Sequence, residues 1–205
     1  MLALSDKRRP IEILGKDIHT KRFILRPIGR WEMAKLVTRA LTVKEVSASY
    51  ARTHRNPRFL KTLRRYRRAN QKTRFYHAII DRQTGDVIGT HGSYYIPVRT
   101  MTVEVILSDL AWWGKEVVAE VRGALIVAYH DSGRVDQVTC NINSRNFGSL
   151  INASKLGFEQ VGVNYMSMFD ELENGPADYI TFSLRGEALK KQVEAYKSEA
   201  ANDAH

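Results

Sequence analysis

The chain lacks the features that mark secreted and membrane proteins. Its 205 residues include a single cysteine, Cys140, so an internal disulfide cannot form. No apolar run approaches the roughly 20 residues that a transmembrane helix requires. No apolar segment near the N-terminus precedes a small-residue cleavage site, as it does in secretory signal peptides. From these absences we expect a cytoplasmic protein without a membrane span.

Internal repeats, low-complexity linkers and metal-binding motifs are absent from the sequence as well. We therefore expect a single domain over residues 1–186, large enough to bury roughly 70% of the surface that the unfolded chain exposes. We expect the polar residues 187–205 to form a helical tail that frays. No bound metal is expected.

Acidic residues are missing from one long stretch, residues 52–74, which holds ten basic residues. They are Arg52, Arg55, Arg58, Lys61, Arg64, Arg65, Arg67, Arg68, Lys72 and Arg74. Without these ten, the 32 Lys and Arg of the chain fall to 22, which equals the number of Asp and Glu. The whole net charge of +10 therefore lies in this one segment.

The basic segment also has the pattern of a helix. Asn56 is a candidate N-cap, and Pro57 suits the first helical position. An apolar stripe follows at helical spacing, made of Phe59, Leu60, Leu63 and Tyr66. The basic side chains should face solvent, where they either form a solvated surface or bind an anionic partner such as RNA or the ribosome. The residues expected at such an interface are Lys61, Arg64, Arg65, Arg67 and Arg68.

Strand and helix patterns alternate along the rest of the chain. Strands are expected at 22–28, 75–81, 86–96, 101–110, 138–142, 159–172 and 177–185. Helices are expected at 33–41, between Gly114 and Gly133, and from Asn146 to Leu156 before Gly157. The glycine turn and helix between 101–110 and 138–142 predict a βαβ unit with a parallel strand pair. The other strands suit an antiparallel arrangement, so the fold class is α/β (α+β).

Five segments match, in order and at roughly the same intervals, segments of the GNAT superfamily of acyl-CoA-dependent N-acyltransferases. They are HTKRFILRPI, GDVIG, WWGKEVVAE, NFGSLINASKLGF and GPADYITFSL. The chain resembles this superfamily over about residues 12–184, and within it the acetyltransferases that modify ribosomal-protein N-termini. The resemblance implies the GNAT fold, a central mixed and mostly antiparallel sheet flanked by helices, with a βαβ unit that binds the cofactor.

The glycine turn before the second helix has the properties of an anion site, because free N–H groups and the helix dipole favour negative charge there. By resemblance, acetyl-CoA binds at this turn, with its pyrophosphate on the backbone. The residues implied are Leu107, Trp113, Gly114, Lys115, Glu116, Val117, Val118 and Asn146, the last on the pantetheine arm or as a helix cap. Ala111 and Glu116 depart from the family pattern, which has Gln or Arg at the first position and glycine or alanine at the second.

Glu116 places a carboxylate where phosphates are expected. A carboxylate in the first turn stabilises a helix by roughly 0.3–1 kcal/mol, but at about 4 Å it repels a charge by about 1 kcal/mol in water. If the side chain turns outward, cofactor binding is only weakened and Lys115 offsets part of the loss. If it covers the backbone amides, the site is blocked. We expect the outward orientation, because the other motif elements are present.

The resemblance also implies catalytic residues. Ser149 matches the serine of the family's Asn-x-x-Ser pattern and would protonate the CoA thiolate, while Ala153 stands where many members have a tyrosine. An ordinary first-turn serine bonded to backbone is the alternative for Ser149. Glu104 resembles the acidic strand residue that acts as general base, directly or through a water. The stretch from Glu104 to Gly114 is one residue shorter than usual, and a one-residue slip on a strand would turn the Glu104 side chain to the other face.

The histidines of the expected hairpin, His77 and His91, are alternative bases or structural residues. We expect Trp112 and Trp113 to form packing and cleft wall, and Cys140 to be a small core residue.

The function expected from this resemblance is direct transfer of an acetyl group from acetyl-CoA to a primary amine, on a protein N-terminus or a small molecule. Two other functions stay open. One is a GNAT-fold binding or structural protein that has lost catalysis, as the departures at positions 111 and 116 would explain. The other is a nucleic-acid-directed protein that uses the basic residues 52–74. The oligomeric state, including a homodimer, is also open.

Overall fold

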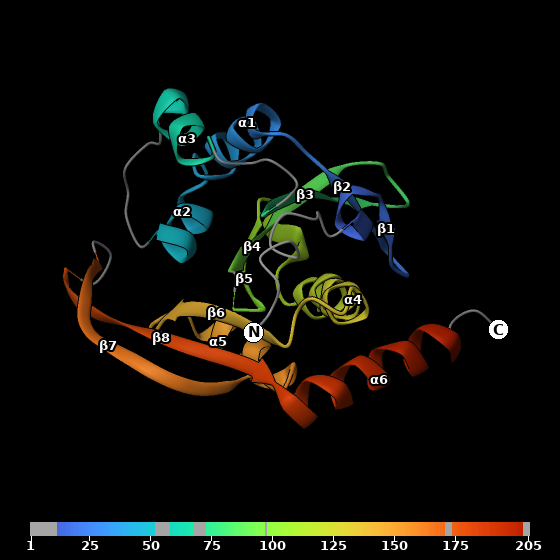
Figure 1. Cartoon of the computed structure of the whole chain (residues 1–205). Helices are drawn as coiled ribbons and strands as arrows, with labels where there is room; N and C mark the ends of the chain where they lie inside the picture. The colour runs from blue at the N-terminus through green and yellow to red at the C-terminus, as the bar shows by residue number, and fades with distance from the viewer. Residues whose placement is uncertain (1–11, 52–57, 68–72, 97, 171–173, 203–205) are drawn as a thin grey trace.

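The computed structural model describes residues 12–51, 58–67, 73–96, 98–170 and 174–202. Within these ranges eight strands form one sheet in the order β1-β2-β3-β4-β5-β6-β8-β7 (Figure 1). The strands are β1 (Ile18–His19), β2 (Phe23–Pro27), β3 (Arg74–Asp81), β4 (Val87–Ile96), β5 (Thr100–Leu107), β6 (Gln137–Asn143), β7 (Glu159–Asp170) and β8 (Gly175–Arg185). The β5–β6 pair is parallel and the other pairs are antiparallel. The expected mixed, mostly antiparallel sheet is confirmed.

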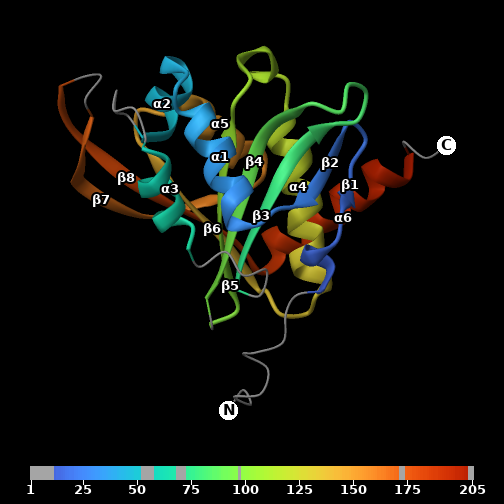
Figure 2. The ribbon, with the colours of Figure 1, turned by 90° about the horizontal axis from the view of Figure 1, so that it is seen from above.

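Helices cover both faces of this sheet (Figures 1 and 2). They are α1 (Arg30–Ala40), α2 (Lys44–Ala51), α3 (Phe59–Arg65), α4 (Val117–Asp131), α5 (Phe147–Lys155) and α6 (Gly186–Asn202), with 3-10 turns η2 (Glu12–Gly15) and η3 (Leu110–Trp112). On one face α1 to α3 bury a cluster that includes Met33, Val46, Tyr66, Tyr76 and Ile106. On the other face α4, α5 and α6 bury the larger core, which includes Val121, Leu125, Ala153, Leu189 and Val193.

The polar segment after residue 185 forms the long helix α6, which packs along α4. Leu189 and Val193 are each only 3% exposed, so α6 contributes to the core. Gly123 of α4 leaves space for the Tyr196 ring, since a Cβ added there would lie 2.4 Å from it. This packing differs from the frayed tail expected from sequence, because a few apolar residues at helical spacing anchor an otherwise polar helix.

Helix α3 begins later than the sequence pattern suggested. Its N-cap is Arg58, while Asn56 and Pro57 lie outside the described residues. The expected apolar stripe is partly wrong, because Leu60 is 65% exposed and Thr62 is buried in its place. Tyr66 is buried as expected and packs edge-on against Tyr76.

The βαβ unit is confirmed as β5, α4 and β6. Strand β5 ends at Leu107, earlier than expected, because Asp109 caps the turn η3 by accepting a hydrogen bond from the N–H of Ala111. The parallel pairing joins only Thr100–Thr102 of β5 to Gln137–Thr139 of β6. Beyond that point β5 continues along β4 to Leu107, while β6 continues along β8 to Asn143. The two strands therefore separate and leave the sheet open between them.

Candidate active site

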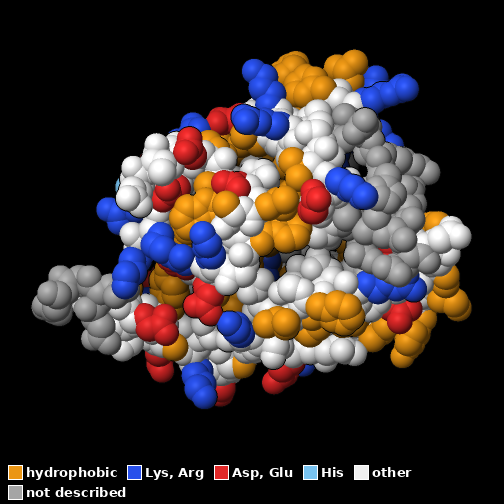
Figure 3. All heavy atoms as spheres, turned by 180° about the vertical axis from the view of Figure 1, so that it is seen from behind, with side chains coloured by type: hydrophobic (Ala, Val, Ile, Leu, Met, Phe, Trp, Pro, Cys, Tyr) orange, Lys and Arg blue, Asp and Glu red, His pale blue; other side chains and the backbone are white. Residues whose placement is uncertain are grey.

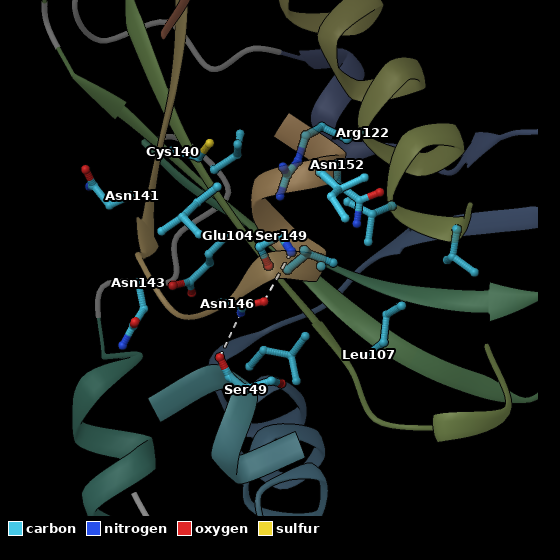
Figure 4. A pocket seen from close by; sticks show the side chains of 18 of the residues that line it. Ser49, Glu104, Leu107, Arg122, Cys140, Asn141, Asn143, Asn146, Ser149 and Asn152 are labelled. Carbon is cyan, nitrogen blue, oxygen red and sulfur yellow. Dashed lines mark hydrogen bonds between the residues drawn. The ribbon is translucent and has the colours of Figure 1, made fainter. Parts of the chain in front are cut away.

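The gap between β5 and β6 is a cleft of about 1060 Å³. Residues 102–107 of β5 and 140–143 of β6 form its walls, and the loop before α4 and the start of α5 complete it. Figure 4 shows side chains from both strands and from α2, α4 and α5 converging on this space. Because β5 and β6 are neighbours in the sheet, the cleft runs through the sheet and is lined by residues from both helical layers.

The loop before α4 is held against the body of the protein by Arg22. The Arg22 guanidinium donates to the Lys115 carbonyl at 2.9 Å and, through Nε, to Glu120 of α4 at 2.6 Å. The backbone N–H of Arg22 donates to the same carboxylate at 2.8 Å. Gly114 has φ +74°, a conformation that glycine adopts without strain. The N-terminus of α4 is thereby fixed at the cleft, which Gly114, Val117 and Val118 line.

Glu116 does not cap the first amides of α4. Its side chain makes no capping hydrogen bond to the helix, and it accepts a hydrogen bond from Lys155 of α5 at 2.8 Å. This hydrogen bond and the Lys155 charge lower the pKa of the Glu116 carboxyl. Glu116 has φ +58°, a left-handed conformation that glycine adopts without the steric cost it carries for other residues. The carboxylate therefore leaves the first amides of α4 uncapped and pairs with Lys155, and both residues line the cleft.

The other predicted residues of the loop lie as follows. Trp113 lines the cleft and donates from Nε1 to the Leu107 carbonyl at 3.4 Å. Lys115 is not among the described residues that line the cleft, and its ammonium lies 5.4 Å from the centre of the Trp112 ring. Lys155, which the sequence motif contains without a separate role, is the lysine that lines the cleft.

Asn146 and Ser149 meet at the start of α5 (Figure 4). Asn146 is the N-cap, and its side-chain oxygen accepts a hydrogen bond from the Ser149 N–H at 3.1 Å. Its side-chain nitrogen donates to the Ser49 carbonyl of α2 at 2.9 Å, which ties α5 to the opposite helical layer. Ser149 lines the cleft, and within the described part of the chain its hydroxyl has no hydrogen-bond partner. The hydroxyl is therefore available to a ligand.

Glu104 of β5 lines the cleft and faces the α1–α3 layer. Its carboxylate accepts a hydrogen bond from the Tyr94 hydroxyl and lies 4.0 Å from the Arg65 guanidinium of α3. Gly92 stands opposite Glu104 in the strand register, and a Cβ there would lie 2.9 Å from the Glu104 carboxylate. The Glu104 side chain thus lies in the cleft, although the stretch from Glu104 to Gly114 is one residue shorter than usual.

Sequence reasoning missed several polar residues of the cleft, among them Tyr94, Tyr179 and Arg122. Burial and the nearby Glu104 charge raise the pKa of both phenols, so both stay protonated hydrogen-bond donors. In the sequence these three residues fit the patterns of ordinary strands and helices, and their spacing does not indicate that they share a cleft. The basic segment predicts that Arg65 binds an anionic partner such as RNA. In the structure its guanidinium lies 4.0 Å from Glu104, and Arg65 lines the cleft.

The histidine alternatives lie in the core. His77 and His91 face each other across β3 and β4, both fully buried, and neither is among the described cleft residues. Burial lowers the pKa of His77 to about 4, and its Nε2 pairs with the Leu14 carbonyl at 3.0 Å. Burial likewise holds the pKa of His91 well below its usual range. Both positions agree with the structural alternative, since neither histidine reaches the cleft in which Glu104 lies.

Lys61, Arg64, Arg65 and Arg67 of the basic segment are exposed, as expected, and Arg68 lies outside the described residues. Figure 3 shows Lys and Arg side chains over the α1–α3 layer at the top of the view. None of the described helices is long and apolar enough to cross a membrane. The same residues contain no group of three or more His, Cys, Asp and Glu that could hold a metal ion.

A cleft between the parallel strands, with a glycine loop and a helix N-terminus beside it, agrees with the family that the sequence matches. The acetyltransferase (GNAT) domain family matches residues 22–159, more than half of the chain. The protein belongs to the GNAT acetyltransferase family. No curated protein matches the chain.

Solved structures of family members share the fold at low sequence identity. The ribosomal-protein-S5-alanine acetyltransferase from Vibrio fischeri is 17% identical, with a TM-score of 0.65, over 82% of this chain and 96% of that one. The spermidine N-acetyltransferase from Vibrio cholerae, in complex with CoA and spermine, is 13% identical, with a TM-score of 0.68, over 82% and 98%. A GNAT-family acetyltransferase from Bacillus anthracis is 13% identical, with a TM-score of 0.66, over 83% and 99%. These likenesses establish the GNAT fold.

Proposed function

We propose that the protein transfers an acetyl group from acetyl-CoA to a primary amine, by direct attack of the amine within a ternary complex. The observation that carries this proposal is the position of Glu104 inside the cleft that begins at the α4 N-terminus. A site for an anionic donor and a candidate base thus share one cavity. Family membership supplies the reaction class.

The donor fits the α4 side of the cleft. The pyrophosphate would accept hydrogen bonds from the first N–H groups of α4, at Val117 and Val118, with Gly114 allowing close approach. Lys155, which pairs with Glu116 at the start of α4, lines the cleft, whereas Lys115 lies over the Trp112 ring. The pantetheine arm would then run along Leu107 and past Asn146 and Trp113. Glu116 would weaken this site without covering it, since its carboxylate pairs with Lys155 and makes no hydrogen bond to the helix amides.

The chemistry requires a base for the amine and an acid for the thiolate. Glu104 would take the proton of the attacking amine, directly or through a water, as the C–N bond forms. Ser149 would donate a proton to the CoA sulfur as the C–S bond breaks. Tyr179 is a second candidate acid, since its protonated phenol lines the same cleft.

The acceptor would enter from the α1–α3 side, where Arg65, Arg74 and Tyr94 line the cleft near Glu104. The neighbouring structures bear the names of a protein N-terminal acetyltransferase and a polyamine acetyltransferase, so both acceptor classes stand for this chain. The exposed cations Lys61, Arg64 and Arg67 favour an acceptor bound to an anionic partner such as ribosomal RNA, and Arg68, the other predicted contact, lies outside the described residues.

Release of CoA from acetyl-CoA, measured with peptides bearing free N-termini and with polyamines, tests this proposal. Glu104→Gln should lower turnover by roughly 10²–10⁴ with little change in acetyl-CoA affinity. Glu159→Gln, a change on the exposed strand β7 away from the cleft, is the matched control and should keep full activity. Full activity of Glu104→Gln would remove Glu104 as base. A wild type that binds acetyl-CoA and acetylates none of these amines would favour the binding-protein alternative.

A further inference from the structure

A buried arginine lines the cleft on its α4 side. Arg122 lies in the middle of α4 and is only 5% exposed, yet it belongs to the cleft wall. Figure 4 shows its guanidinium reaching from α4 toward the space between Cys140 and Asn152, above Ser149. The cationic end of this side chain is therefore presented to the cavity and shielded from bulk solvent.

The Arg122 guanidinium has no counter-charge in the described part of the chain. No ion pair or hydrogen bond joins it to those residues, and its buried Nε lacks a partner. The ionisable groups that interact with it electrostatically include Cys140, Tyr129 and His91. Burial keeps each of these three neutral, because it raises the pKa of Cys140 and Tyr129 and lowers the pKa of His91. An unpaired buried charge is strongly destabilising, which indicates that a bound anion completes this site.

The position of Arg122 shows which substrate would bring that anion. Cys140 of β6 follows the last parallel pair, Thr102 with Thr139, so Arg122 stands near the closed end of the cleft. It projects from the same helix whose N-terminus forms the phosphate site. Glu104 and Tyr94 face the opposite helical layer, where the acceptor amine is expected. An anion at Arg122 would thus belong to the donor, at the acyl end of the molecule.

We propose that Arg122 binds a carboxylate at the far end of the acyl group, so that the preferred donor is a dicarboxylic acyl-CoA of the succinyl type. This inference rests on the proposed function and changes only the acyl group. The C–N bond still forms as the C–S bond breaks, the amine loses its proton to Glu104, and CoA leaves as the thiol. A guanidinium suits this role because it can hold a carboxylate with two parallel hydrogen bonds.

Calorimetric titration with succinyl-CoA and butyryl-CoA isolates the carboxylate, because the two acyl chains have the same length and differ in a terminal carboxylate or methyl group. The wild type should bind succinyl-CoA roughly tenfold more tightly or better, as expected for a charge-assisted hydrogen bond. Arg122→Met should abolish this preference, and Arg122→Lys should keep part of it. Arg134→Met is the control, because Arg134 is also buried but lies over the Tyr95 ring outside the cleft.

The outcomes separate this inference from the proposed function. Equal binding of the two donors by the wild type overturns the inference and leaves acetyl transfer standing. A preference that survives in Arg122→Met places the carboxylate elsewhere and also overturns it. Failure of acetyl-CoA, butyryl-CoA and succinyl-CoA to bind at all overturns both. Arg122→Met should fold with an unchanged or higher Tm, since it removes an unpaired buried charge, so loss of the preference would not reflect unfolding.

Discussion

On the α4 side of the cleft the proposed phosphate site depends mainly on backbone N–H groups, whereas the α1–α3 side depends on side chains from several elements. Gly114 and the first turn of α4 present N–H groups from one short stretch of chain. Glu104, Tyr94 and Arg65, by contrast, come from β5, β4 and α3 and meet only in the folded protein. A site for a common cofactor can use a local backbone motif, while a site for a particular acceptor depends on long-range packing. The two sides should respond differently to mutation.

The largest expected effect is on the backbone side. Gly114→Glu should abolish acetyl-CoA binding, because a carboxylate would stand in the place of the phosphates and the positive φ would become strained. Gly133→Glu is the matched control, since Gly133 has φ +65° at the other end of α4, outside the cleft. Calorimetric titration of both variants checks this. Unchanged affinity in Gly114→Glu would contradict the assignment of the phosphate site.

Two residues from different elements of the cleft wall are candidates for the acid that protonates the thiolate. They are Ser149 of α5 and Tyr179 of β8. Ser149→Ala should lower turnover by roughly 10²–10⁴ with little change in acetyl-CoA affinity, since a proton donor to the thiolate acts mainly in the transition state. Tyr179→Phe should have the smaller effect. Steady-state kinetics of both variants decide between them, and the reverse order would assign the proton transfer to Tyr179.

A smaller effect is expected at the departure from the family motif. Glu116→Gly should tighten acetyl-CoA binding several-fold, because repulsion of about 1 kcal/mol corresponds to roughly a fivefold change in Kd. It also frees Lys155 for the phosphates and removes a left-handed non-glycine residue. Glu116→Gln separates the two effects, because it removes the charge but keeps a non-glycine residue in the left-handed conformation. Weaker binding of both variants would show that the Glu116–Lys155 pair orders the site instead of opposing the ligand.

The smallest effect on acetyl transfer is expected from the outer cations. Replacing Lys61, Arg64 and Arg67 by Gln should leave acetyl-CoA binding and fold nearly unchanged, since exposed substitutions cost little stability. Retention on RNA should weaken and lose part of its salt dependence. Arg65→Gln is the contrasting variant, because Arg65 reaches Glu104 and should alter turnover. RNA retention equal to that of the wild type would leave the outer cations as a solvated surface.

The same contrast explains what the sequence could predict. The mixed sheet, the βαβ unit and the glycine ends of α4 and α5 follow from local periodicity and turn residues. The position of Gly114 at the cleft and the capping by Asn146 are equally local. The partners of Glu104, the burial of Arg122 and the burial of both histidines depend on strand register and helix packing. Those contacts join residues distant in the chain, and spacing carries no record of them.

Helix α6 and Lys115 illustrate the limits of composition. A polar segment was expected to fray, yet Leu189 and Val193 are enough to anchor it on the core. Lys115 was expected at the phosphates from its place in the motif, but its ammonium lies over the Trp112 ring and Lys155 lines the cleft instead. In both cases the sequence shows which residue types are present, whereas the contacts of their side chains depend on neighbouring elements of the fold.

Titration of the wild type with acetyl-CoA by calorimetry tests the central claim most directly, because every proposed role depends on a donor in this cleft. We expect saturable binding of one acetyl-CoA per chain that weakens in the presence of free CoA. Gly114→Glu should show no binding under the same conditions. Absence of binding by the wild type would contradict the assignment of a site for acetyl-CoA in this cleft.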